Sequence, residues 1–154
     1  MGKAAINGII VGIVIIVSIV SIVYGLNNPN GLLHSVLSTH KENLVDASIV
    51  VPPSQFISYS VTAPPDSNNC KIIGTFSARG GNHDIVVYVV DQNGFIDLQQ
   101  GNRFNTYFST PQQISGNFDV SVPCDKKIHV VFSNTFSIIT SKTVTTKVDF
   151  QYER

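Results

Sequence analysis

An uncharged apolar run near the start of the chain, AAINGIIVGIVIIVSIVSIVYG at residues 4–25, constrains the fold most strongly. As a helix of 22 residues it would be roughly 33 Å long at ~1.5 Å per residue, which matches the ~30 Å hydrocarbon core of a bilayer. The alternative is a signal peptide cleaved at residues 23–25, but the apolar core of a signal peptide has only about 7–15 residues. The length of the run therefore favours an uncleaved transmembrane signal anchor over residues 1–25.

Charged residues around this run indicate its orientation. Lys3 and the α-amino group precede it, whereas no Lys or Arg occurs from Leu26 to His40. Because positive charge is retained on the cytoplasmic side, we expect a single-pass cell-membrane protein with a cytoplasmic N-terminus and an extracellular or periplasmic C-terminal domain. The chain has ten Lys and Arg residues and ten Asp and Glu residues, so it has no positive field with which to bind nucleic acid.

Small residues recur every four positions in the predicted anchor, at Ala4, Gly8 and Gly12, and Asn7 lies beside them. This pattern lets two helices approach closely in lipid, and an intramembrane amide seeks a partner on another helix. The alternative is that Gly is simply frequent in membrane helices and that water solvates Asn7 at the interface. We expect this face to associate with another membrane subunit or with a second copy.

The segment 26–46 is interpreted as a connector. It begins with the turn sequence NNPNG, in which Asn30 is a candidate helix cap. Residues at helical spacing follow: Leu33, Val36, Leu37, His40 and Leu44. Their spacing predicts a short amphipathic helix, which would pack either on the domain or on the membrane surface. His34 and His40 would not share a face of it, so we expect both to be solvated and not to bind metal.

From residue 47 to residue 154 the apolar pattern changes to a period of two, which is typical of strands. The segments with this character are 48–53, 56–63, 70–78, 84–91, 117–122, 127–133 and 143–152. Turn-forming sequences separate them, and no stretch has a helical period. Residues 84–91 are apolar on both faces, as expected of a strand covered on both sides. The sequence therefore predicts an all-β, antiparallel, jelly-roll-like β-sandwich of seven or eight strands.

Three segments, GTFSARGGNHDIVVYVVD, GNFDVSVP and HVVFSNTFSIITSKTVTTKVDF, resemble the GOLD (Golgi-dynamics) domain over residues 48–152. The likeness centres on Asp84, Asn134, Phe136 and Lys142, and it implies a sandwich that binds protein or lipid. Eukaryotic cargo receptors of this family carry the domain first and end in a coat-binding tail. Here the apolar segment comes first, so the resemblance is to a membrane-anchored, prokaryotic-type member and implies no coat sorting.

A bend interrupts the strand pattern in the stretch VVFSNTFSIITSKTV, residues 130–144. Asn134 is expected to close the bend, because Asn caps turns with its side chain and tolerates the left-handed conformation. We expect Phe136 to pack beneath it as a core plug. Two interpretations of Ile138 and Ile139 remain open: a packed loop that completes the core, or an exposed apolar tip that contacts a partner.

The two cysteines, Cys70 and Cys124, each lie at a strand end beside a turn. An even cysteine count outside the cytoplasm permits a disulfide, and two free thiols are the alternative. The GOLD resemblance implies a cysteine pair placed elsewhere, with one member where this chain has Val131.

No catalytic or metal-binding pattern is present. Adjacent strand residues such as His83 and Asp84 point to opposite faces, and we expect Asp84 to organise the preceding RGGN turn. The sequence DQNG at residues 91–94 begins like a calcium loop but lacks the later Glu, so it predicts a hairpin turn. Phe104 and Tyr107 are candidates for contact with a partner.

These patterns together predict a protein that is not an enzyme and needs no cofactor. We expect a membrane-anchored binding module, or an accessory subunit of a larger membrane complex, with its β-sandwich outside the cell. The alternative is a self-assembling, pilin-like surface protein in which apolar helices form the core of a filament.

Overall fold

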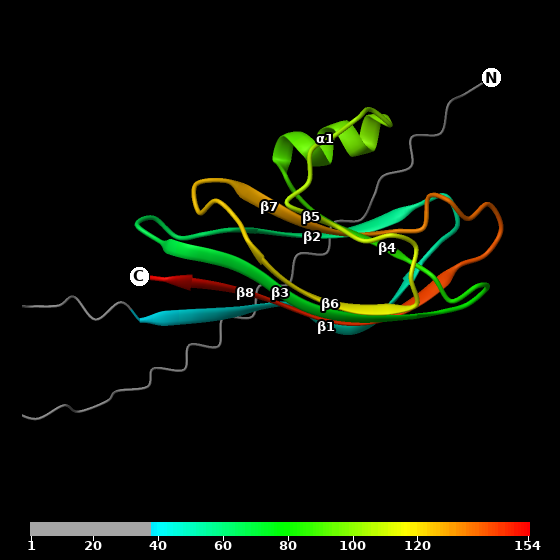
Figure 1. Ribbon diagram of the computed structural model, residues 1–154, viewed down its shortest axis with the longest axis horizontal. Coiled ribbons are helices and arrows are strands. Elements are labelled where there is room, and N and C mark those ends of the chain that lie inside the picture. The colour runs from blue at the N-terminus through cyan, green and yellow to red at the C-terminus, as the bar shows by residue number, and fades with distance from the viewer. Residues whose placement is uncertain (1–37) are drawn as a thin grey trace, which may run out of the picture.

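The computed structural model describes residues 38–154. The predicted anchor, with Ala4, Asn7, Gly8 and Gly12, lies outside the described residues. Between residues 38 and 154, no helix has the length and apolar character needed to cross a membrane. These residues form two antiparallel β-sheets that pack face to face, which confirms the predicted β-sandwich (Figure 1).

Each sheet has four strands, in the orders β1-β8-β3-β6 and β2-β7-β4-β5. The first sheet contains β1 (Thr39–Val51), β8 (Lys142–Glu153), β3 (Asn68–Arg79) and β6 (Ser115–Ser121). The second contains β2 (Phe56–Thr62), β7 (Lys127–Ser133), β4 (Val86–Asp91) and β5 (Phe108–Ser109). This is the strand order of a jelly roll, in which two four-stranded sheets enclose one core.

The loops gather at two ends of the sandwich, because every strand pairing is antiparallel. We call one end the disulfide pole; it holds the start of β1, the end of β8 and the loops 63–67 and 122–126 (Figure 1). We call the other end the isoleucine pole; it holds the loops 52–55, 80–85, 110–114 and 134–141. The chain therefore enters the sandwich at the disulfide pole, and the isoleucine pole lies a full strand length away.

Alternation along the strands builds the core, as the period of two predicted. On β3 the inward positions Cys70, Ile72, Phe76 and Ala78 are all buried. Gly74 shares this face, and its missing side chain leaves the space that the Phe118 ring of β6 occupies. A larger residue at Gly74 would collide with that ring, so this glycine is required by close packing between neighbouring strands.

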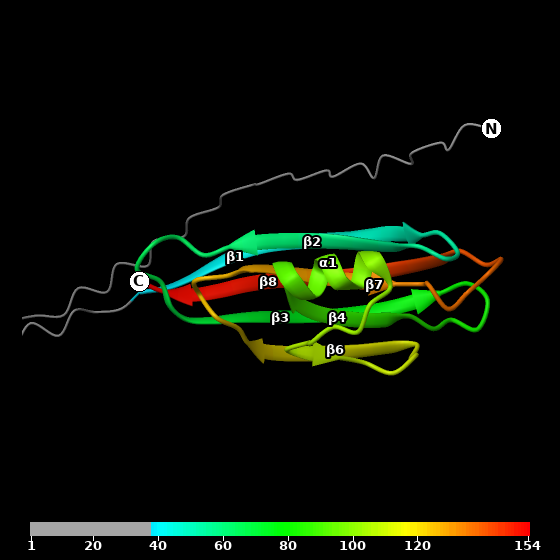
Figure 2. The same ribbon diagram turned by 90° about the horizontal axis from the view of Figure 1, so that it is seen from above.

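Strands β4 and β7 are buried on both faces, which confirms the expectation for residues 84–91. Their inner face joins the core, while the outer residues Val90, His129 and Val131 are also buried. A helix, α1 (Gln92–Gln100), covers this outer face, and Figure 2 shows it lying over the second sheet, along the direction of the strands. The continuous apolar character of these strands is thus explained by a cover on each side.

Helix α1 corrects the prediction of a hairpin turn at DQNG. Asp91 is its N-cap and accepts a hydrogen bond from the backbone N–H of Gly94, with an N···O distance of 2.9 Å. Gly101 ends the helix in the left-handed conformation, with φ of 71°. A capping Asp and a terminal Gly are ordinary helix boundaries, but the residues between them lack a clear apolar stripe, so the local sequence favours a turn.

Strand β1 corrects the helix predicted in the connector. Residues from Thr39 onward, including His40 and Leu44, form a strand paired with β8; the earlier residues of the predicted helix lie outside the described part of the chain. A β-bulge between Asn43 and Val45 inserts Leu44 as an extra residue. The bulge shifts the alternation of inward and outward residues by one position. The sequence therefore shows no period of two there, and its apolar residues fall at an apparently helical spacing.

Candidate partner-binding site

Asn134, just after β7, is the hub of the isoleucine pole and is fully buried. Its side-chain amide nitrogen lies 3.2 Å from the carbonyl oxygen of Val51, 3.1 Å from that of Pro52 and 2.8 Å from that of Thr140. Its two amide hydrogens thereby tie loop 134–141 to the end of β1. The predicted closing of the bend by this side chain is confirmed, but Asn134 does not adopt the left-handed conformation considered for it.

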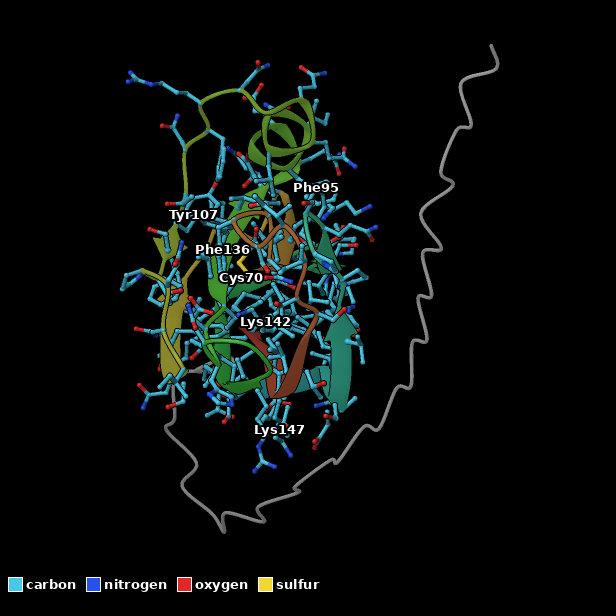
Figure 3. All side chains as sticks on the ribbon, turned by 90° about the vertical axis from the view of Figure 1, so that its right-hand side faces the viewer. Cys70, Phe95, Tyr107, Phe136, Lys142 and Lys147 are labelled. Atoms are coloured by element: carbon cyan, nitrogen blue, oxygen red, sulfur yellow. A yellow bond between two sulfur atoms is a disulfide. The ribbon has the colours of Figure 1, made fainter. Side chains whose placement is uncertain are left out.

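A buried ion pair between Lys142 and Asp84 lies at the same pole as Asn134. Lys142 is only 3% exposed, and its Nζ lies 2.5 Å from Asp84 Oδ1. The same ammonium donates to the carbonyl oxygen of Gly80 at 3.2 Å, so Lys142 holds the RGGN turn directly, whereas Asp84, expected to organise this turn, is bonded to Lys142. Figure 3, seen from this end, shows Lys142 near the centre, whereas Lys147 points away from the outer face of the first sheet.

Phe136 differs from its predicted role as a core plug. It is half-buried and is not part of the core cluster. Its ring instead covers the ion pair, with Lys142 Nζ 5.6 Å from the ring centroid. A cation near an aromatic face is attracted to it, so Phe136 shields the ammonium from water.

Ile138 and Ile139 form an exposed tip on this braced loop. Their exposed fractions are 84% and 88%, so the interpretation as a packed loop is wrong and the exposed apolar tip is what the structure shows. Ser137 holds the loop beneath them: its Oγ donates to the Thr140 carbonyl at 3.0 Å, and its carbonyl accepts from Ser54 N–H at 2.8 Å.

Other exposed apolar side chains lie at the same pole. Val50, at the end of β1, is 56% exposed, and Ile114, just before β6, is 58% exposed. Within residues 38–154, four of the six large hydrophobic side chains that are exposed thus lie at the isoleucine pole: Val50, Ile114, Ile138 and Ile139. Such concentration at one end is more informative than single exposed apolar residues, which are normal on protein surfaces.

Charge is nearly absent from this pole. The only acidic residue in its loops is Asp84, which is paired with Lys142. Arg79, the last residue of β3, and His83 are exposed. Sequence reasoning did not single out Arg79, Val50 or Ile114, because their common location depends on how the loops gather.

Phe104 and Tyr107 do not join this surface. They lie in the segment between α1 and β5, and not in any of the four loops of the isoleucine pole. The Phe104 ring packs edge-on against Tyr88, with centroids 5.2 Å apart, and the Tyr107 hydroxyl donates to Asp91 at 3.4 Å. Tyr107 therefore contacts the N-cap of α1 and Phe104 packs on β4, so the predicted contact residues divide into two separate places.

At the opposite end, Cys70 and Cys124 form a disulfide with their Cα atoms 5.4 Å apart. The bond ties the start of β3 to loop 122–126, which settles the alternative left open between a bridge and free thiols.

Beneath α1, a histidine is held in an apolar environment. The rings of His129 and Phe95 stack with centroids 4.1 Å apart, and His129 Nε2 lies 2.9 Å from Gln92 Oε1. Burial, aided by the nearby positive charge of Lys127, lowers the pKa of His129 from 6.5 to about 4. The ring is therefore neutral near pH 7, and its buried Nδ1 has no hydrogen-bond partner.

Among the described residues, no group of three or more His, Cys, Asp or Glu side chains is placed to hold a metal ion. No known protein family and no curated protein matches this chain.

Proposed function

We propose that this protein is a non-enzymatic binding module, anchored in the cell membrane by residues 1–25, with its β-sandwich outside the cell. In this proposal it serves as an accessory subunit of a larger membrane complex. The GOLD-like segments of the sequence and the apolar run at residues 4–25 support the proposal.

The observation that carries the proposal is the exposed pair Ile138 and Ile139 on a loop fixed by buried polar contacts. Exposed apolar side chains at the end of a structured loop favour binding, because little conformational freedom is lost when a partner covers them. The loop lies at the pole opposite to the one where the chain enters β1. A domain tethered through its N-terminus would thus present this tip away from the point of attachment.

The proposal predicts two independent contacts with the complex. One is the face of Ala4, Gly8 and Gly12 in the bilayer, where Gly8→Leu with Gly12→Leu would prevent close helix packing. The other is the tip, where Ile138→Asp with Ile139→Asp would place two charges in an apolar contact.

The experiment is gentle solubilisation of native membranes, followed by native electrophoresis of the tagged full chain. We expect the wild type to migrate in a large complex and each double variant to migrate as a smaller species. Ile96→Asp is the matched control, because Ile96 on α1 is only 39% exposed and lies away from the isoleucine pole. Unchanged migration of both double variants would exclude a role as an accessory subunit.

A further inference from the structure

The chemistry of the isoleucine pole indicates what kind of partner it fits. Its exposed side chains combine an apolar tip with two residues that can carry positive charge, Arg79 and His83, and its loops hold no exposed acid. Because the only acid in these loops, Asp84, is already bound to Lys142, Arg79 has no carboxylate partner within the pole.

We infer that this pole docks into an apolar pocket of a partner protein whose rim carries a carboxylate facing Arg79. This inference rests on the proposed function and names the chemistry of its partner. Ile138 and Ile139 would fill the pocket, as central apolar anchors do in protein interfaces. Arg79 lies on β3 opposite Thr143 of β8, and thus beside the base of loop 134–141, where its guanidinium would meet the rim.

A second copy of this chain fits the pole less well. Two copies in contact through their isoleucine poles would bring together two surfaces that both carry Arg79 and hold no exposed acid. Like charges brought together at an interface oppose association, so the exposed charge argues for a different, acidic partner.

A lipid surface also fits less well. Recognition of anionic membranes typically uses clusters of four to eight basic residues, whereas this pole exposes only Arg79 and His83. The rigid loop is also suited to a pocket of fixed shape, because Asn134 and Ser137 hold its backbone in one conformation.

The test is site-specific photo-cross-linking of the full chain in its native membranes. A benzophenone amino acid replaces Ile138 in one variant and Ile96 in a matched control. We expect the probe at position 138, but not at position 96, to attach to a single protein, at an apolar segment with Asp or Glu close by in its sequence or structure.

Further substitutions in the position-138 variant test the chemistry of the contact. We expect Ile139→Asp to reduce the cross-linking yield about tenfold or more. Arg79→Glu should reduce it several-fold, with a smaller effect at high salt because salt screens the ion pair, while Arg79→Lys retains most of the yield. Circular dichroism of each variant verifies that the sandwich is folded.

The outcomes separate the inference from the proposed function. Attachment to a protein with no sensitivity to Arg79→Glu would overturn the acidic rim and leave the binding module standing. Attachment only to lipid or to a second copy of this chain would overturn the inference that the partner is a different protein. Equal yields from positions 138 and 96 would remove the tip as a binding site, and with it the observation that carries the proposed function.

Discussion

The two poles of the sandwich are fixed by different means. At the disulfide pole, the covalent bond between Cys70 and Cys124 holds a loop region that carries charged residues: Asp66, Asp125 and Lys126. At the isoleucine pole, buried polar contacts of Asn134 and Lys142 hold loops that are almost without charge. One end is thus a cross-linked, solvated base, and the other is an apolar surface that buried polar contacts support.

The largest expected effect comes from removing the covalent bond. For Cys70→Ser with Cys124→Ser, the free energy of unfolding should fall by about 4 kcal/mol, because the bond closes a loop with a sequence separation of 54 residues. Urea denaturation of the domain measures this change. A loss of stability below about 1 kcal/mol would mean that the disulfide does not hold the loops of its pole in place.

The next effect concerns the ion pair at the isoleucine pole. Lys142→Met should lower the free energy of unfolding by about 3 kcal/mol, because Asp84 would keep a charge without its partner. Lys147→Met is the control, since the Lys147–Asp46 pair is exposed and salt and water screen such pairs, so its removal should have a much smaller effect. Equal effects of the two substitutions would contradict a supporting role for the buried pair.

The third effect concerns His129, which lies beneath α1 between the two poles, and the dependence of stability on pH. The unfolded chain protonates His129 near its ordinary pKa of 6.5, while the folded protein resists protonation until about pH 4. Stability should therefore decrease as pH falls from about 6.5 to 4, by roughly 1–3 kcal/mol.

His129→Phe should remove this part of the pH dependence, because Phe keeps an aromatic ring beside Phe95 and does not titrate. Thermal unfolding at several pH values compares the variant with the wild type. An identical pH dependence in both would show that His129 is not the responsible group.

The smallest expected effect is at the tip. Ile138→Asp with Ile139→Asp should change the free energy of unfolding by no more than about 0.5 kcal/mol, as is usual for exposed positions. The same denaturation experiment measures it. A loss of 2 kcal/mol or more would mean that these isoleucines belong to the packed structure and are not a free surface.

Much of the sandwich is predictable from sequence, because inward and outward residues alternate along most strands. Residues 70–78 and 143–152, for example, show the period of two that the structure realises in β3 and β8. The start of strand β1 was not predicted because the bulge at Leu44 shifts this period. Helix α1 was not predicted because DQNG favours a turn locally. In the structure, contacts of Phe95 with His129 and Phe56 stabilise a helix there.

The candidate site was only partly predictable for a related reason. Asn134, Lys142 and Asp84 could be singled out individually, and the structure joins all of them at one pole. The common location of Arg79, Val50 and Ile114 at this pole follows from bringing four separate loops together. Disulfide pairing likewise depends on the three-dimensional distance between Cys70 and Cys124, which spacing along the chain does not determine.

The proposed binding role requires that the isoleucine pole present a pre-organised apolar tip. The most direct test is ¹⁵N relaxation of the backbone amides of Ile138 and Ile139 in solution. We predict order parameters near 0.85, equal to those of the flanking strands β7 and β8. Values below about 0.6, with those of Asn134 and Lys142 unchanged, would show a flexible tip and exclude a pre-organised binding surface.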